Sequence, residues 1–400
     1  MSTTPDGGAT GLAPGENLAL LRKARCLTQK QLAQRANISL SLLAKIEVGD
    51  RTLTPAVAAV VGRAMGITMA EVMGKATVAE TGAQSLTDLR AALRDYDVPG
   101  GTRLPEGQLG AEMALAHGFR KDVKVVQLLE ALPGLLRNAT TNALTANTDA
   151  AWAALCQVYS TVYWIAARYR WMDLAELAVA RQRWAVEQRP TPLALAVAAR
   201  DRAGTYLNFG DVERGLDVID HAVSEAERAL SGQARDTAVN VLTLRGMTLA
   251  GRLPDKKEAR REAARHIRSA ASSAEGLGSR DTWVLGLTVG PQNTVLHRLA
   301  TYVDLGRPRD ALELLDDLPA ALEGLPATRV APTYISVARA QLDIGDRDGA
   351  LKHLGIAWDT APQMARIHPM GREVFRVLSS LHRRANPTLT RMSKLSGIGL

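Results

Sequence analysis

Apolar side chains recur every three or four positions along most of the chain, which is the spacing of a helix with one buried face. This periodicity runs almost without a break from Leu109 to about Arg384. A separate group of short amphipathic segments occupies the stretch from Pro14 to about Met73. Ala and Leu dominate and clusters of β-branched residues are few, so the pattern predicts an all-α protein rather than one built on a sheet.

Polar, turn-rich stretches separate these helical regions from one another. The stretch that follows the first region contains one short apolar stripe, made by Leu86, Leu89 and Leu93. A helix this short is marginal alone, so we expect it to pack on the first repeat or across a dimer. The chain thus divides into a disordered arm (1–14), a first domain (15–75), a linker with a short helix (76–108), a repeat domain (109–385) and a basic C-terminal tail (386–400), which we expect to be frayed.

The long helical part repeats a local motif. Tyr206–Leu216, Tyr302–Leu312 and Gln341–Leu351 each place a long or aromatic residue four positions before a glycine and a small residue plus Leu five and six positions after it. The glycine supplies a left-handed cap that ends one helix, and the small residue lets the next helix cross closely. Gly251 begins a degraded copy, and Trp171–Ala178 is a weaker copy without a glycine.

A helix pair of this kind cannot bury its apolar faces alone, so neighbouring pairs are expected to stack into a superhelix. The motif resembles the tetratricopeptide repeat, although its spacing of about 39 to 55 residues exceeds the usual ~34. The resemblance implies an α-solenoid of about five to seven repeats with a concave face.

The first domain contains the pattern of two helices joined by a tight turn. Thr28 is a suitable N-cap for a helix over residues 29–36, and Ser39 for the helix that follows. Asn37 stands in the turn, where a residue that tolerates positive φ is needed. Segments near 16–26, 55–65 and 69–73 complete a bundle of five helices, whose small core includes Leu32, Leu43 and Ile46.

This domain resembles the helix-turn-helix of the Xre family of repressor-like regulators. The matching residues are Thr28-Gln29, Leu32-Ala33, Ile46-Glu47 and Gly49. The resemblance implies that the helix opening at Ser39 enters the major groove of double-stranded DNA. The candidates that face bases are Ser39, Leu40, Ser41, Ala44 and Lys45, and the candidates that hold phosphates are Gln29, Arg51, Arg22, Lys23 and Lys30.

Two leucines depart from this resemblance. Leu40 and Leu42 occupy positions of the recognition helix where polar residues are commoner. Leu40 could touch the methyl group of a thymine, or the domain could have turned toward protein contacts. The second reading supports an alternative function, a scaffold protein in which the helix-turn-helix is an interaction module.

Composition adds little to this picture. The formal net charge of +8 permits nucleic-acid binding without proving it. Cys26 and Cys156 are too few and too far apart for a disulfide framework, and both are expected to be small buried side chains. The sequence shows neither a signal peptide nor a run of ~18 apolar residues, so we expect a cytoplasmic protein without a membrane segment.

Motifs of catalysis and of cofactor binding are missing from the sequence. The 7 histidines form no HExxH motif, and no Walker A loop is present. Gly276-Leu-Gly278 lacks the third glycine of a dinucleotide fingerprint, and Asp343, Asp346 and Asp348 lack the final Glu of a calcium loop. We therefore expect neither an enzyme nor a metal or cofactor site.

An Xre-like domain joined to tetratricopeptide-like repeats resembles the RRNPP family of peptide-responsive regulators. That resemblance implies a homodimer that binds an inverted-repeat operator, and a short signalling peptide, as in quorum sensing, on the concave face of the repeats. The linker helix would couple the two domains, whereas the direction of the response, the ligand and the operator stay open. In a third reading the repeats serve dimerisation only.

Candidate ligand residues follow from the register of each repeat. Residues two, six and ten positions before the capping glycine share one helix face. Asn amides there can bond an extended peptide backbone, and Arg can hold a terminal carboxylate. The opposing reading treats these side chains as solvated or interhelical. The candidates are Arg200, Asn208, Arg245 and Arg339, with Asn293 at the start of the helix that ends near Gly306.

Overall fold

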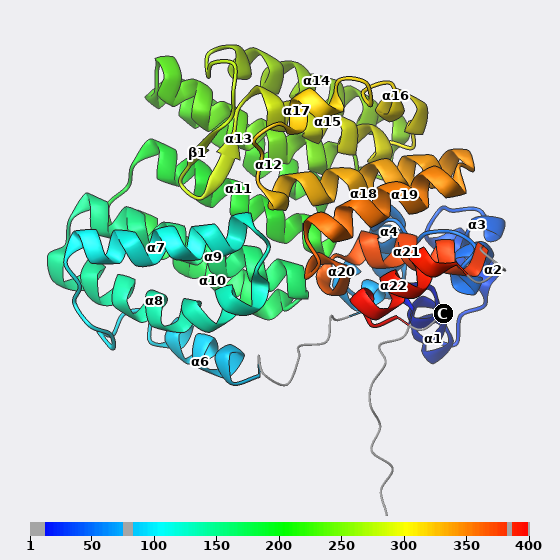
Figure 1. Ribbon diagram of the computed structural model, residues 1–400, viewed down its shortest axis with the longest axis horizontal. Coiled ribbons are helices and arrows are strands. Elements are labelled where there is room, and N and C mark those ends of the chain that lie inside the picture. Colours follow the sequence, from blue (N-terminus) through cyan, green and yellow to red (C-terminus); the bar gives the residue numbers. More distant parts are fainter. Residues whose placement is uncertain (1–12, 75–82, 382–385, 399–400) are drawn as a thin grey trace, which may run out of the picture.

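The computed structural model describes residues 13–74, 83–381 and 386–398 of the chain (Figure 1). Within these ranges the protein is almost wholly helical, with a single two-stranded hairpin. The predicted all-α class is confirmed, with a helix-turn-helix domain followed by stacked helices. Residues 1–12 of the expected arm and residues 75–82 of the linker lie outside the described ranges.

Five helices form the N-terminal domain, in the order that the sequence predicts. Thr28 Oγ1 accepts a hydrogen bond from the Gln31 N–H at 3.2 Å, and Ser39 Oγ accepts one from the Leu42 N–H at 3.1 Å. Asn37 takes a φ of 51° in the tight turn, as expected. The helices are α1 (Pro14–Ala24), α2 (Gln29–Arg35), α3 (Leu40–Val48), α4 (Pro55–Met65) and α5 (Met69–Met73).

A buried ion pair ties α1 to the end of α3. Arg22 donates from Nε and Nη2 to the two carboxylate oxygens of Glu47, at 2.7 and 2.8 Å. Gln29 Nε2 donates a third bond to the same carboxylate at 2.8 Å. Burial alone would raise the pKa of Glu47, but these hydrogen bonds and the Arg22 charge outweigh it and lower the pKa.

Stacked helices make up the rest of the chain, and helices neighbouring in sequence pack on one another (Figure 1). They are α6 (Ala83–Arg94), α7 (Glu106–Lys121), α8 (Val125–Ala146), α9 (Asp149–Tyr169), α10 (Met172–Gln188), α11 (Pro192–Phe209), α12 (Val212–Ala229), α13 (Gly232–Ala250) and α14 (Lys256–Glu275). After the hairpin follow α15 (Pro291–Asp304), α16 (Pro308–Leu312), α17 (Leu318–Leu322), α18 (Ala327–Ile344), α19 (Arg347–Thr360), α20 (Met364–Ile367), α21 (Pro369–Leu381) and α22 (Pro387–Ser396).

The repeat turns form where the motif places them. Gly210, Gly306 and Gly345 have φ values of 81°, 70° and 89°, the left-handed conformation that a helix C-cap requires. In the weaker copy Arg170 takes this role with a φ of 59°. Gly251 has a φ of −61° instead, which agrees with the reading of this copy as degraded.

The superhelix closes on itself. The N–H of Val126, at the start of α8, donates to Gln363 Oε1 at 3.1 Å, a contact that spans 237 positions of sequence. Helix α7 also packs on α18. The inner helices α9, α11, α13, α15 and α18 therefore surround a central space.

A β-hairpin interrupts the helices where the sequence predicts helical periodicity without a break. Strands β1 (Thr282–Val284) and β2 (Leu287–Val289) pair antiparallel through a turn at Leu285 and Gly286, both with positive φ. The Asp281 carboxylate accepts hydrogen bonds from the N–H groups of Gln292 and Asn293 at 2.9 and 2.7 Å, which fixes the hairpin to the start of α15. The helical prediction is wrong here because it gave too little weight to these turn residues.

Three further expectations have clear outcomes. The linker helix is α6, whose Leu89 and Leu93 are fully buried against α8 and α10, so the predicted packing on the first repeats is found. The expectation of a frayed tail is wrong, because α22 buries Leu389 and Met392 against its neighbours. Cys156 is buried as expected, but Cys26 is exposed in a turn.

We predict that Arg22→Met destabilises the N-terminal domain by about 3–5 kcal/mol, because it leaves the Glu47 carboxylate buried without its cation. Urea unfolding of the full chain, followed by hydrogen exchange at the amides of α1 and α3, measures this loss. Adding Glu47→Leu should recover most of it, since both charges are then gone. Lys23→Met at the exposed neighbouring position is the control. If Arg22→Met lowers the free energy of unfolding no more than Lys23→Met does, the prediction is contradicted.

Candidate nucleic-acid interface and ligand cavity

Helix α3 presents the predicted base-facing residues on the surface of the N-terminal domain. Ser39, Ser41 and Lys45 are exposed, Leu40 is 46% exposed, and Ala44 is half-buried. Arg51, Lys23 and Lys30, three of the predicted phosphate contacts, are exposed around this helix. The face is thus available for contact with a groove of DNA.

Two of the predicted phosphate contacts serve the interior of the domain instead. Arg22 is buried, and its guanidinium is held by Glu47 and by the Leu27 carbonyl, so the prediction that it binds phosphate is wrong. Gln29 uses its side-chain amide on Glu47. A phosphate contact at Gln29 therefore depends on the N–H groups at the start of α2.

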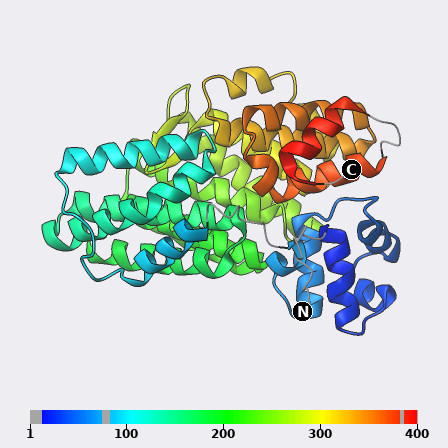
Figure 2. The same cartoon turned by 60° about the horizontal axis from the view of Figure 1, so that its bottom comes forward.

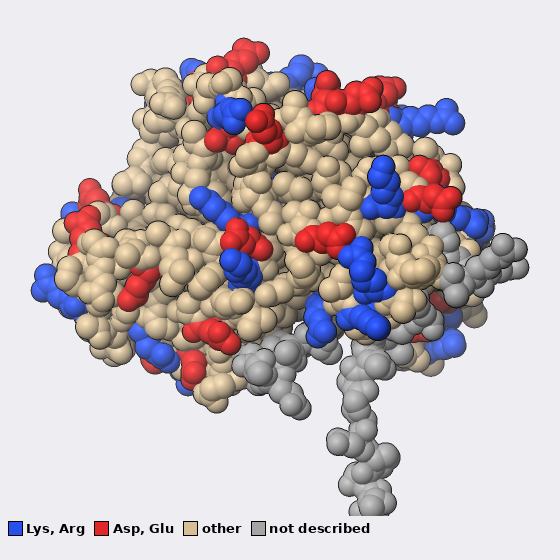
Figure 3. All heavy atoms as spheres, viewed as in Figure 1, with Lys and Arg blue, Asp and Glu red and all other residues tan. Residues whose placement is uncertain are grey.

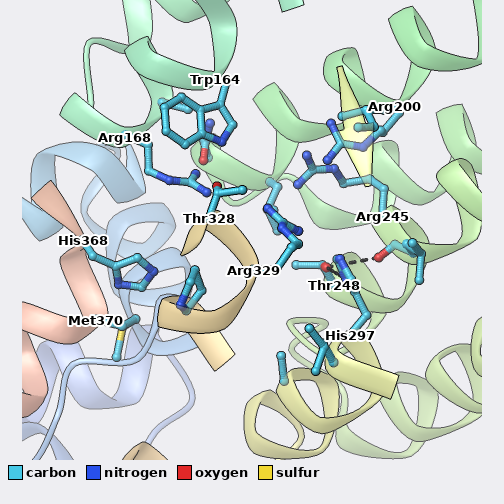
Figure 4. A pocket seen from close by; sticks show the side chains of 18 of the residues that line it. Trp164, Arg168, Arg200, Arg245, Thr248, His297, Thr328, Arg329, His368 and Met370 are labelled. Carbon is cyan, nitrogen blue, oxygen red and sulfur yellow. Dashed lines mark hydrogen bonds between the residues drawn. The ribbon is translucent and has the colours of Figure 1, made fainter. Parts of the chain in front are cut away.

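A cavity of about 340 Å³ lies inside the closed superhelix (Figure 4). Its wall comes from the inner helices, from the hairpin through Trp283 and Leu287, and from the end of α7 through Arg120. Pro55 of α4 and Met69 and Met73 of α5 also line it. The N-terminal domain therefore contributes to the wall of a cavity in the repeat domain.

Arginines dominate the polar part of this wall. Of the described residues that line the cavity, none is an Asp or a Glu. Arg200 is paired with Asp201 at 2.6 Å and Arg252 with Asp304 at 3.0 Å. The other lining arginines have no carboxylate oxygen within 4.0 Å in the described part of the chain, and they are Arg120, Arg168, Arg170, Arg245 and Arg329.

These side chains come from α7, the end of α9, α13 and α18, and all five line one cavity. Figure 4 shows Arg168 and Arg245 approaching from opposite sides, with Arg329 between them. The guanidinium carbons of Arg168 and Arg120 lie 4.9 and 5.5 Å from the ring centroid of Trp164, within the range of a cation–π contact. The outer face in Figure 3, by contrast, carries acidic and basic side chains together.

Burial and mutual repulsion act on the arginine cluster. Burial, with help from neighbouring arginines, lowers the pKa of Arg329 and Arg120 to about 9. The same causes lower the pKa of Arg168 and Arg170 to about 10, and Arg245 shares this value. All five side chains are still cations at neutral pH, and Asp201 and Asp281, which lie outside the cavity wall, offset their charge only in part.

The histidines of the wall do not add to that charge. Burial, together with nearby arginines, lowers the pKa of His368 to about 3 and moves the pKa of His297 well below its usual range. Both rings are neutral at pH 7. Each can donate one hydrogen bond and accept one.

Four of the five predicted ligand residues line the cavity, namely Arg200, Asn208, Arg245 and Asn293. The structure contradicts the prediction for Arg339, which is 7% exposed and pairs with Asp304 at 2.9 Å outside the cavity wall.

Sequence reasoning missed most of the unpaired arginines. Arg168 stands two positions before the left-handed residue Arg170, as Asn208 stands before Gly210. The same register would have found it, but the missing glycine hid the repeat turn. Arg120 and Arg329 lie near helix ends outside that register, so no local signal marked them.

The N-terminal domain lies beside the C-terminal helices of the repeat domain (Figure 2), and hydrogen bonds join the two domains. Arg170 Nη1 donates to the Met73 carbonyl at 2.5 Å, and Arg63 Nη2 donates to the Gly210 carbonyl at 2.9 Å. The Leu53 N–H donates to Glu373 Oε1 at 3.0 Å. Since Arg170 also lines the cavity, one side chain belongs both to the cavity and to the domain contact.

One group on the outer helices has the composition of a metal site. Asp220, Glu262 and His266 place their ligand atoms within 4.8 Å of one another. Arg265 already donates hydrogen bonds to both carboxylates, at 2.7 and 2.8 Å to their nearest oxygens. This arrangement is a surface ion-pair network rather than a cation site. Among the described helices, none is long and apolar enough to span a membrane.

Comparison with known proteins identifies the first domain. The profile of the helix-turn-helix family matches residues 18–72. A solved structure of a PrgX mutant shares 11% identity over 95% of this chain and 99% of its own, with a TM-score of 0.29. A PrgX/iCF10 complex shares 10% over 97% and 98%, with a TM-score of 0.27. Scores this low do not establish a common arrangement of helices. No curated protein matches the sequence.

We predict that the domain contact depends on pH through Glu373. Burial raises the pKa of this carboxyl, so the docked form holds its proton more readily than a solvated carboxyl does. The resulting stabilisation is complete below the ordinary pKa and is lost as the pH rises through the raised one. Thermal unfolding of Glu373→Gln, which keeps an acceptor for the Leu53 N–H, should lack this decline as the pH rises above the ordinary pKa of a glutamate.

Exposed Glu187 supplies the matched control for this measurement, since Glu187→Gln removes a similar charge far from the contact. Parallel pH profiles for the wild type and Glu373→Gln would show that Glu373 does not titrate in this range.

Proposed function

We propose that this protein is a DNA-binding transcription regulator whose helical repeat domain binds a small ligand in the arginine-lined cavity. One observation carries the proposal: α4 and α5 of the helix-turn-helix domain form part of the cavity wall. A ligand there would touch both domains at once. The match of residues 18–72 to the helix-turn-helix family supports the DNA-binding half.

The proposed regulator acts as a homodimer in the cytoplasm. One helix-turn-helix makes few base contacts, and two-fold symmetric proteins read symmetric sites, so an inverted-repeat operator is the expected target. A short signalling peptide is the ligand class that the sequence resemblance implies. The cavity volume of about 340 Å³ suits a small ligand.

Coupling between ligand and DNA would act at the shared wall. A ligand can shift the position of the N-terminal domain only if it binds the docked and released states with different affinity. Arg170 can produce this difference in affinity, because its guanidinium donates to the Met73 carbonyl and also lines the cavity. A ligand that binds Arg170 would compete with the Met73 carbonyl. We place the coupling there rather than at α6, which packs on α8 and α10.

A scaffold function is the second candidate. Leu40 and Val48 are 46% and 74% exposed on the surface of α3, which favours a protein partner there. A scaffold would show no preference among DNA sequences, so the DNA test below separates the two functions.

We predict that Lys45→Ala and Arg51→Ala weaken DNA binding in different ways. Losing a base contact at Lys45 should cost about 1–3 kcal/mol at the preferred site and relax sequence preference. Losing a phosphate contact at Arg51 should weaken all sequences alike and flatten the salt dependence. Fluorescence anisotropy on a site selected from genomic fragments, at several salt concentrations, distinguishes the two.

Arg261→Ala is the control, because Arg261 is an exposed arginine on distant α14. A stable monomer without preference for any genomic fragment would reject the regulator and leave the scaffold. Repeating the DNA titration in the presence of a low-molecular-weight extract from a culture of the cells that make this protein tests whether a ligand changes DNA affinity.

A further inference from the structure

We infer that the cavity binds a compact phosphorylated polyanion, a small molecule with two or three adjacent phosphate groups such as a nucleoside diphosphate or triphosphate. The inference rests on the proposed function, since it names the chemical class of the ligand for the same cavity. Charge, hydrogen-bonding capacity and shape of the wall support it independently.

Charge is the first argument. Five lining guanidiniums have no carboxylate partner among the described residues, and a buried uncompensated charge is costly. The terminal phosphate of such a molecule carries about 1.5 to 2 negative charges at neutral pH and each bridging phosphate about one, so a diphosphate or triphosphate brings about three to four negative charges to these five cations. An acidic residue brings only one charge with each main-chain unit, so a peptide would need an almost unbroken acidic run.

Hydrogen-bonding capacity is the second argument. Guanidiniums only donate, and the buried indole N–H of Trp164 and amide nitrogen of Asn208 have no acceptor in the described part of the protein. The main chain of a peptide offers donors and acceptors in equal number, and its N–H groups would find only neutral acceptors on this wall, such as Asn293 Oδ1, Thr288 Oγ1 and Thr328 Oγ1, which have no partner in the described part of the protein. Phosphate oxygens only accept, and Arg binds them through paired N–H groups.

The shape of the wall is the third argument. Apolar side chains stand beside the arginine cluster and offer a surface for an uncharged part of the ligand. They include Leu207, Val241, Leu244, Leu287 and Met370. A molecule with a charged end and a flat or apolar end therefore fits better than an inorganic ion alone.

Isothermal titration of the full chain at about 0.15 M salt tests the inference, since this salt screens weak surface binding of anions. The probes are ATP, GTP, inorganic triphosphate, a peptide of five glutamates and an uncharged pentapeptide. We expect a nucleoside triphosphate to bind one per chain and more tightly than either peptide. Tighter binding than inorganic triphosphate would show that the apolar wall takes part. Tighter binding of the glutamate peptide, or no binding of any phosphate compound, would overturn the inference.

Paired variants locate the site. Arg245→Met with Arg329→Met should weaken nucleotide binding by about tenfold or more, because two charge-assisted contacts are lost. Arg228→Met with Arg261→Met removes the same charge from exposed positions on α12 and α14 and should leave binding unchanged. Equal losses in the two double variants would reject this cavity as the site.

The melting temperature of the ligand-free protein distinguishes a binding role of the arginine cluster from a purely structural one. Removing two mutually repelling cations should leave the melting temperature of the ligand-free protein unchanged or higher. A lower melting temperature for the cavity variant than for its control would mean that the cluster holds the fold together.

Lys45→Ala separates this result from the proposed function. Lys45 lies on α3, the helix proposed to face DNA. If Lys45→Ala leaves nucleotide affinity unchanged, the nucleotide does not bind at this surface of the protein. Failure of nucleotide binding with intact operator binding would overturn only the inference, whereas loss of operator preference with intact nucleotide binding would reject only the regulator.

Discussion

The structure holds several like charges together away from water, and its other contacts must offset the free energy that this costs. Arginines from α7, α9, α13 and α18 meet in one cavity although each loses hydration and repels the others. Nothing local in any single helix favours this meeting. It is maintained by the apolar contacts of the surrounding helices and by the closure of the superhelix through α7, α8, α18 and α20. The packing of the repeats thus offsets the unfavourable free energy of the arginine cluster.

The closure of the superhelix also explains why the N-terminal domain has a defined position on the repeat domain. An open solenoid would present a continuous concave groove, whereas this one leaves an inner space with α4 and α5 at its edge. The domain contact includes single hydrogen bonds to main-chain carbonyls, as at Met73 and Gly210, and buried apolar residues of the two domains belong to one hydrophobic cluster. Single hydrogen bonds of this kind can be exchanged at small cost.

Much of the architecture could be predicted from local patterns. The caps at Thr28 and Ser39, the turn at Asn37 and the left-handed glycines all follow from the chemistry of a few adjacent residues. The register before Gly210 and Gly251 also found Asn208 and Arg245 on the cavity wall. The roles of Arg22 and Arg339 could not be found in this way, because each depends on a carboxylate that only the tertiary fold brings near. A positive charge looks the same in sequence whether it faces DNA, a ligand or a buried partner.

Arg170 shows how closely these roles are joined. In the related turns glycine reaches the left-handed conformation without strain, whereas a residue with a side chain is held there at a cost of about 1–2 kcal/mol. A repeat idealised toward its own consensus would place glycine at this position and fold more readily. It would also lose the guanidinium that lines the cavity and holds the Met73 carbonyl. Optimising the solenoid as a scaffold would therefore remove one of the hydrogen bonds that hold the N-terminal domain, so the least regular repeat turn is the one that engineering should leave untouched.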